Sequence, residues 1–199
     1  MLTEFARSRA RSLLNAVAQL FAAAGIGPNV LTVLGLVFVL LISAVIAAGY
    51  EALGGVLAIL ATAFDAVDGT LARTTGKVSK FGAFLDSTLD RWADAALFFA
   101  IIIRGLMLQS DWMVVLAALA LIGSLLVSYT RARAEGLAAN IKDGWFTRLE
   151  RTVVLIAGLI LTAWFGVYAL LVVLAILAVF ANLTAGQRIV AAYRVLDRK

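Results

Sequence analysis

Of the 199 residues, 63% are hydrophobic and only 15% charged, whereas soluble domains are nearer half apolar and a quarter charged, so the composition predicts a protein embedded in a bilayer. The chain contains neither cysteine nor histidine, which excludes disulfides, thiol nucleophiles, ordinary zinc sites and histidine acid–base chemistry. The net charge of +5 is better explained by membrane topology and anionic lipid headgroups than by nucleic acid, which we do not expect as a partner.

Residues 1–27 are expected to form an amphipathic helix that lies along the membrane interface. Basic and apolar residues follow one another there at helical spacing. They are Arg7, Arg9, Arg11, Leu13, Leu14, Val17, Leu20 and Phe21. The alternative is a secretory signal peptide, but the apolar part is weak and no small-residue cleavage site precedes a mature soluble domain.

Six apolar runs follow, most of them near the length of about 20 residues that crosses a bilayer as a helix. They are residues 29–50, 52–72, 81–106, 112–132, 152–165 and 167–187. Gly166 separates the last two runs and predicts a tight helical hairpin. The expected fold is an all-α integral membrane protein: residues 28–190 form a six-helix transmembrane catalytic domain, and residues 191–199 form a basic cytoplasmic tail.

The distribution of cations predicts the orientation in the membrane. With six transmembrane helices, most basic residues fall at or near one side, whereas the opposite loops hold essentially Arg104 alone. The residues on the basic side are Arg7, Arg9, Arg11, Arg73, Lys77, Lys80, Arg131, Arg133, Lys142, Arg148, Arg151, Arg188, Arg194, Arg198 and Lys199. Because basic loops stay in the cytoplasm, we expect a multi-pass cell-membrane protein with both termini and the active site cytoplasmic.

Four aspartates stand out in residues 65–90. Asp65 and Asp68 are three residues apart, and Asp86 and Asp90 are four apart, so each pair shares one face of a helix. Four carboxylates that meet between two helices repel one another, and hard divalent cations such as Mg²⁺ or Mn²⁺ would neutralise them. The alternative is a set of helix-end aspartates paired with nearby Lys and Arg, which this number and spacing disfavour.

Neighbouring residues suit a phosphate-bearing ligand. Gly69 and Gly82 lack side chains one turn from the carboxylates, where a bulky ligand could approach the backbone. Arg73 ends the second run on the same side and is placed to hold a phosphate. Asp94 continues the face of Asp86 and Asp90 by one turn, and we interpret it as an ion-pair or helix-contact residue rather than a catalytic one.

These residues resemble the CDP-alcohol phosphotransferases, membrane enzymes of phospholipid synthesis. The family pattern is D-x-x-D-G-x-x-A-R, eight residues, then G-x-x-x-D-x-x-x-D. The chain matches it at every position, with Asp65, Asp68, Gly69, Ala72, Arg73, Gly82, Asp86 and Asp90. The resemblance also covers the six-helix plan and the amphipathic start, and hence essentially the whole chain.

The resemblance implies a role for each matched residue. Asp65, Asp68 and Asp86 would bind Mg²⁺ or Mn²⁺, two ions being expected, and Asp90 would complete the metal site and act as the general base. The CDP-linked lipid would lie against both Asp65 and Asp68 and against the remaining motif residues, Gly69, Ala72, Arg73 and Gly82. The segment PNVLT is similar to the family's helix start beside the nucleotide, which adds Asn29 and Thr32.

A second group of residues suits an anionic acceptor. Five side chains are expected to gather on the cytoplasmic side. They are Ser128, Arg131, Arg133, Arg148 and Arg151. The alternative is ordinary positive charge in cytoplasmic loops, and without the aspartate motif it would be preferred.

The runs SYTRARAEG and, later, RLER resemble the phosphatidylinositol phosphate synthases, whose acceptor is inositol 1-phosphate. The chain has Arg131 where Lys is expected and Leu149 where Pro is expected. The archaeal archaetidylinositol phosphate synthases are similar in this region, so the resemblance implies either a diacyl or an ether lipid. Another phosphorylated acceptor, such as glycerol 3-phosphate, is the nearest alternative.

Two further expectations concern the class of protein and its oligomeric state. A divalent-cation transporter is disfavoured because the acidic residues cluster at one end and no inverted repeat is present. The resemblance implies a homodimer, with weak support from small residues that permit close packing between membrane helices. These are Ala93, Ala95, Ala96 and Gly123.

Overall fold

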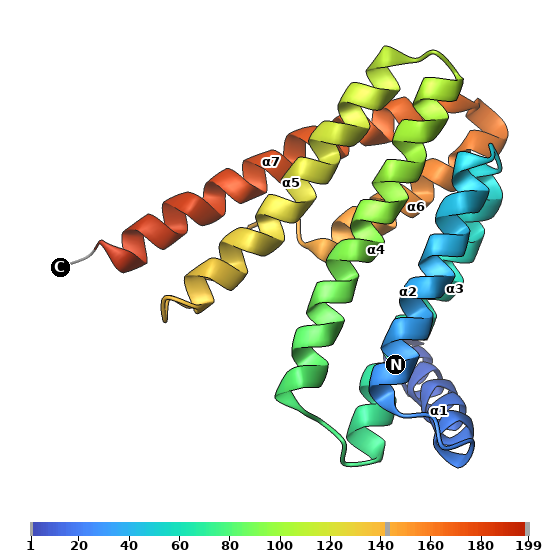
Figure 1. The fold of residues 1–199 in the computed structure, drawn as a ribbon, viewed down its shortest axis with the longest axis vertical. Coiled ribbons are helices and arrows are strands. Elements are labelled where there is room, and N and C mark those ends of the chain that lie inside the picture. The colour runs from blue at the N-terminus through green and yellow to red at the C-terminus, as the bar shows by residue number, and fades with distance from the viewer. Residues whose placement is uncertain (1, 142–143, 198–199) are drawn as a thin grey trace. The chain divides into compact units, whose positions relative to one another are not determined.

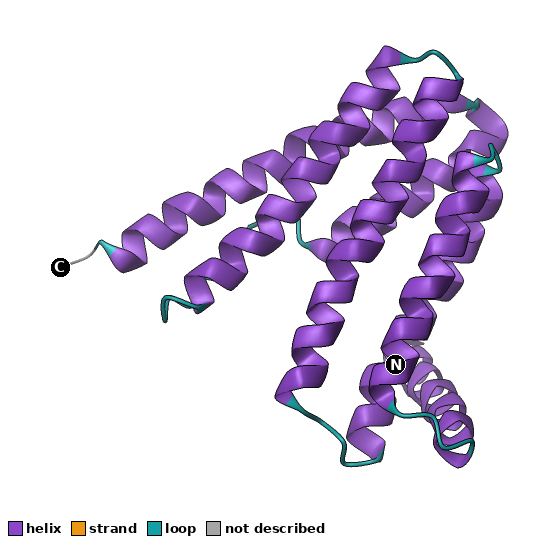
Figure 2. Ribbon diagram, in the orientation of Figure 1, coloured by secondary structure: helices purple, strands orange, loops and turns teal. Residues whose placement is uncertain are grey.

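The computed structural model describes residues 2–141 and 144–197, and within these residues it contains helices and loops without a strand (Figures 1 and 2). The helices are α1 (Leu2–Ala23), α2 (Pro28–Ala47), α3 (Glu51–Thr74), α4 (Lys80–Met107), α5 (Asp111–Glu135), α6 (Arg148–Phe165) and α7 (Val167–Leu196). Lys142, Arg198 and Lys199, three of the cations that predict the orientation, lie outside the described residues. The expected start of the tail at residue 191 is not a helix end, because α7 continues to Leu196.

Each expected apolar run corresponds to one helix, but within residues 2–141 and 144–197 only four helices are both long and apolar enough to cross a membrane. These are α2, α3, α5 and α7. Helix α4 carries Asp86, Asp90 and Asp94 within its first 15 residues, and α6 has 18 residues and begins with charged side chains. Charges of the candidate site therefore lower the hydropathy of these two helices, and the six-span arrangement stays a prediction.

The chain folds into two compact units. The first contains Met1–Leu41 and Leu57–Ala93, and the second contains Ile42–Val56 and Asp94–Lys199. Helices α2, α3 and α4 each pass from one unit into the other. The first unit therefore carries all four motif aspartates, and the second carries all the arginines expected to bind the acceptor.

The core of the first unit joins α1 to α2 and α3. Four buried residues form it, with three partly buried residues packed against them. They are Ala18, Leu31, Val67 and Leu71, together with Leu14, Phe21 and Phe64. The rings of Phe21 and Phe64 meet edge to face with their centroids 5.9 Å apart. Leu13 and Leu20 of α1 lie outside this core and are 68% and 71% exposed, and the interfacial position of α1 stays a prediction.

In the second unit α5 packs along α7, and α6 also packs against α7 (Figure 1). Gly123 of α5 permits the close approach, because a Cβ there would lie 2.7 Å from Asn182 Nδ2 and 2.9 Å from the Ala181 Cβ. Its small size therefore serves packing within the chain, and the homodimer stays a prediction. Gly166 has φ +59°, joins α6 to α7 alone, and forms the expected tight reversal.

Candidate metal centre and acceptor site

Three of the four motif aspartates meet in the first unit. Asp65 and Asp68 come from α3 and Asp86 from α4, and their carboxylate oxygens lie within 4.8 Å of one another. Oxygen ligands bind Mg²⁺ or Ca²⁺ at about 2.0–2.6 Å, so two ligands of one ion are separated by at most about 5 Å. The distances and the all-oxygen donor set therefore fit a hard divalent cation.

Asp68 is the best fixed of the three carboxylates. It is buried, and Thr32 Oγ1 of α2 donates a hydrogen bond to Asp68 Oδ2 at 2.8 Å. Its neighbours Val67 and Leu71 belong to the core of the first unit, which anchors this part of α3. The structure thus places Thr32, expected beside the nucleotide, in direct contact with a metal-binding candidate.

Asp90 is not a member of the three-carboxylate cluster. It lies one helical turn after Asp86 on α4, and its side chain is 14% exposed. Asp90 Oδ2 is 3.8 Å from Arg91 Nη1, beyond hydrogen-bonding distance. A carboxylate near the cluster but outside it is suited to accepting a proton from a substrate.

The residues expected to line the nucleotide come from α2, α3 and α4. A Cβ at Gly82 would lie 3.1 Å from Ser79 Oγ and 3.2 Å from Asn29 Oδ1, so Asn29 and Gly82 adjoin across two helices. A Cβ at Gly69 would lie 3.4 Å from Arg73 Nη1 on the same helix.

Ala72 and Arg73 complete this group on α3. Ala72 is half-buried and Arg73 exposed. Arg73 Nη2 donates to Thr70 Oγ1 at 3.2 Å, which holds the guanidinium near the end of α3. The motif residues therefore belong to the same unit as the cluster, and Arg73 offers a cation to an anionic ligand.

In the second unit Arg148 and Arg151 meet around Asp94. Asp94 Oδ1 is 3.8 Å from Arg148 Nε, and Asp94 Oδ2 is 3.8 Å from Arg151 Nη2. The Arg151 side chain is 4% exposed and its Nη1 also donates to the Phe146 carbonyl oxygen at 3.2 Å. The prediction that Asp94 is an ion-pair residue is confirmed.

The other residues expected to bind the acceptor come from α5 and not from α6. Arg131 is exposed and pairs with Glu135, its Nε lying 2.8 Å from Glu135 Oε1. Arg133 is also exposed, near the end of α5, and Ser128 is half-buried one turn earlier. Exposed arginines at these positions can attract an anion from solvent but do not enclose it tightly.

Arg188 of α7 is a further candidate, which the sequence predicts only as one of the cations on the basic side of the membrane. It is buried, and its Nη1 donates to the carbonyl oxygen of Val127, the residue before Ser128. Gly144 packs against it, since a Cβ there would lie 3.2 Å from Arg188 Nε. An arginine directly after an apolar run was the available indication, because buried charge in such a helix usually has a function.

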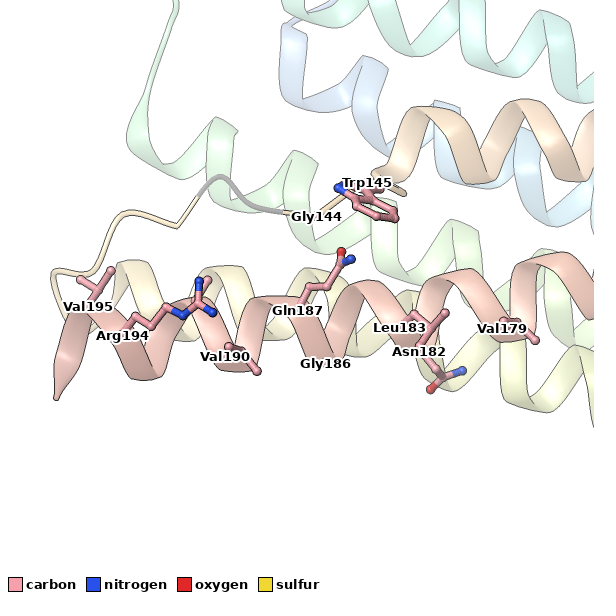
Figure 3. Close-up of a pocket in the computed structure, with 11 residues that line it drawn as sticks. Gly144, Trp145, Val179, Asn182, Leu183, Gly186, Gln187, Val190, Arg194 and Val195 are labelled. Atoms are coloured by element: carbon pink, nitrogen blue, oxygen red, sulfur yellow. The ribbon is translucent and has the colours of Figure 1, made fainter. Parts of the chain in front are cut away.

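A separate groove of about 1010 Å³ runs along α7 in the second unit (Figure 3). Its lining consists of Gly144, Trp145, Val179, Asn182, Leu183, Gly186, Gln187, Val190, Ala191, Arg194 and Val195. The lining is largely apolar and its charged member is Arg194, which extends from α7 beside Val190 and Val195 in Figure 3. It therefore lacks the paired arginines that a phosphate site requires.

Comparisons with known proteins show the family to which the chain is similar. The model of the CDP-alcohol phosphatidyltransferase family matches residues 26–191. Archaetidylinositol phosphate synthase of Pyrococcus horikoshii is 38% identical over 193 residues, which is 96% of each chain. Phosphatidylinositol phosphate synthase of Corynebacterium glutamicum is 36% identical over 96% of this chain and 89% of its own.

Two solved structures of the phosphatidylinositol phosphate synthase of Mycobacterium tuberculosis are also similar. The structure with CDP-DAG bound has a TM-score of 0.87 at 27% identity, over 92% of this chain and 94% of the other. The complex with manganese and citrate has a TM-score of 0.84 at 27% identity, over 90% of this chain and 88% of the other.

Proposed function

The chain belongs to the CDP-alcohol phosphatidyltransferase family, and on that premise we propose that it transfers the lipid phosphate of a CDP-linked lipid to inositol 1-phosphate and releases CMP. The main support for this proposal is that carboxylate oxygens of Asp65, Asp68 and Asp86 lie within 4.8 Å of one another. Relatives named for inositol phosphate products support the acceptor. They are named for both archaetidyl and phosphatidyl products, so the proposal covers both kinds of lipid.

The reaction is a direct displacement. Divalent cations held by Asp65, Asp68 and Asp86, two Mg²⁺ or Mn²⁺ ions in our proposal, would neutralise the diphosphate of the CDP-lipid and the departing CMP. Asp90 accepts the proton of the inositol hydroxyl, whose oxygen bonds to the lipid-bearing phosphorus while the bond to CMP breaks. Thr32 keeps the Asp68 carboxylate oriented through its 2.8 Å hydrogen bond.

The remaining motif residues bind the nucleotide part of the donor. Arg73 contacts the diphosphate, and Gly69 and Gly82 leave room for the ligand beside the backbone. Asn29 adjoins Gly82 and offers an amide to the nucleotide. Ala72, three residues after Gly69, shares its face of α3.

The acceptor phosphate binds to the arginines at the start of α6 and to Arg188 of α7, all in the second unit. Arg148 and Arg151 adjoin the same carboxylate, and Arg188 adds a third buried or half-buried cation beside Ser128. Charge-assisted contacts from guanidinium groups are the usual means of holding phosphate. The exposed Arg131 and Arg133 attract the acceptor from solvent.

We also propose a cellular location and a membrane topology for the enzyme. It is a multi-pass protein of the cell membrane with a cytoplasmic active site, in line with four helices long and apolar enough to cross a bilayer. A homodimer is proposed on the family resemblance.

An assay of CMP release in detergent with a CDP-linked lipid and a panel of acceptors tests the function. Inositol 1-phosphate should give the highest kcat/KM, above glycerol 3-phosphate and free inositol. Preference for glycerol 3-phosphate would retain the family chemistry and change the product. Preference for free inositol would remove the phosphate-binding role of the arginines.

A further inference from the structure

We propose that Asp94 is a positioning residue that orders Arg148 and Arg151 for the acceptor phosphate. The inference rests on the proposed function, because it assumes that these two arginines bind the acceptor. It assigns a role to an aspartate that lies outside the D-x-x-D-G-x-x-A-R, G-x-x-x-D-x-x-x-D pattern.

The geometry gives Asp94 contact with both arginines at once. Arg148 and Arg151 are three residues apart in the first turn of α6 and so lie on one face. The two oxygens of Asp94, on α4, are each 3.8 Å from one guanidinium nitrogen, Oδ1 from Arg148 Nε and Oδ2 from Arg151 Nη2. One carboxylate thus fixes the spacing of two cations on a neighbouring helix.

The distances indicate an electrostatic pairing and not a closed bidentate hydrogen bond. Arg148 Nε and Arg151 Nη2 are both buried, and 3.8 Å is beyond hydrogen-bonding reach of Asp94. Arg148 Nε and Arg151 Nη2 are therefore paired electrostatically with Asp94 while these two N–H groups remain 3.8 Å from its oxygens. An incoming phosphate oxygen can accept from such groups without first displacing a short Asp–Arg bond.

The charges of Asp94, Arg148 and Arg151 also favour binding of phosphate. Two guanidinium groups and one carboxylate carry a net charge of about +1, so the group still attracts a phosphate dianion. Without Asp94, two cations would face each other, and Arg151, 4% exposed, would remain buried with less compensating negative charge. Arg148 is 38% exposed and would move toward water, which would separate the pair.

The test compares Asp94→Asn, which removes the charge at nearly constant size, with Asp94→Glu, which keeps it. Asp94→Asn should raise the KM for inositol 1-phosphate by about tenfold or more, as loss of one charge-assisted contact does. The KM for the CDP-lipid should stay within about twofold, as expected for contacts made only with the acceptor. Asp94→Glu should restore much of the acceptor affinity. Competitive inhibition by inorganic phosphate should weaken in parallel with the acceptor KM.

A matched control separates positioning from loss of folding. Glu51→Gln removes the carboxylate of another ion pair of the second unit, with Arg104, and should lower stability without changing the acceptor KM. An unchanged or lower acceptor KM in Asp94→Asn would overturn the proposal, the lower value meaning that Asp94 competes with phosphate. The same KM change in Glu51→Gln would assign the effect to general destabilisation and also overturn it.

The design distinguishes failure of this inference from failure of the proposed function. If Arg151→Ala raises the acceptor KM but Asp94→Asn does not, only the role of Asp94 is wrong. If the wild type releases no CMP with any acceptor, the proposed function is wrong, and calorimetric titration with inorganic phosphate still tests Asp94. Weaker phosphate binding by Asp94→Asn than by Asp94→Glu would then support the inference, and equal binding would overturn it.

Discussion

Arg104 Nε donates a hydrogen bond to Glu51 Oε1 at 2.6 Å, and this pair joins the start of α3 to the end of α4. Glu51 is buried and the Arg104 side chain is 22% exposed. Gly49 makes room for the guanidinium, because a Cβ there would lie 3.0 Å from Arg104 Cζ. Its φ of +97° also favours glycine. The pair therefore depends on a turn that few other residues could form.

Glu51→Gln should lower the free energy of unfolding by about 2–3 kcal/mol, since a largely buried cation loses its counter-charge but keeps some solvent contact. Thermal unfolding in detergent measures this as a lower Tm. Glu135→Gln is the control, because its pair with Arg131 is about half exposed and should contribute roughly 0.5 kcal/mol or less. Equal Tm values for the two variants would contradict the structural role of Glu51.

Asp68→Asn should reduce turnover by several orders of magnitude while the protein still folds. The side chain keeps its size but loses the charge that a bound divalent cation requires. Steady-state CMP release with and without EDTA measures both the variant and the metal requirement. Asp111→Asn, an exposed aspartate in the first turn of α5, is the control. Full wild-type activity in EDTA would refute the metal centre.

Thr32→Val should raise the divalent-cation concentration needed for half-maximal activity by roughly 10–100-fold. The variant removes the hydroxyl that orients Asp68, and loss of such a supporting contact weakens metal sites by about that factor. Titration of activity with Mg²⁺ or Mn²⁺ measures it. Thr32→Ser retains the hydroxyl and should behave nearly as the wild type. If both variants need the same metal concentration as the wild type, the hydrogen bond has no role in the metal site.

Asp90→Asn should abolish transfer and leave the Kd for the CDP-lipid nearly unchanged. The proposed base acts on the acceptor hydroxyl and contributes little to binding of the nucleotide. Binding of the CDP-lipid and single-turnover CMP release are measured on the same preparation. A loss of binding as large as the loss of rate would make Asp90 a metal ligand and not a base.

Arg151→Ala should raise the acceptor KM more than Arg131→Ala does. The Arg151 side chain is 4% exposed, whereas the Arg131 side chain is 53% exposed and already paired with Glu135. A charge-assisted contact to phosphate contributes about 1.5–3 kcal/mol, and less when water screens it. Initial rates over a range of inositol 1-phosphate concentrations measure both. Equal effects of the two variants would contradict a site centred on α6.

The helices could be predicted because apolar runs correspond to α2–α7. The three-residue interval also places Asp65 and Asp68 on one face of α3. Their meeting with Asp86 of α4 was expected from the pairing of consecutive helices, whereas Asp90, four residues after Asp86, lies outside the cluster. The hydrogen bond from Thr32 to Asp68 spans 36 residues, and no local pattern reports which helices touch. Gly123 illustrates the same difficulty, since a small residue indicates close packing without identifying its partner.

Helix α7 has 30 residues and is therefore about 45 Å long, whereas the hydrocarbon core of a bilayer is about 30 Å thick. Its first 20 residues contain no charged side chain, and Arg188 and Arg194 follow in the last third. A helix that crosses with its apolar part in hydrocarbon must extend about 15 Å beyond it. Arg188 would then lie near headgroup depth, where a water-soluble sugar phosphate and a lipid-anchored nucleotide can both be reached by one enzyme.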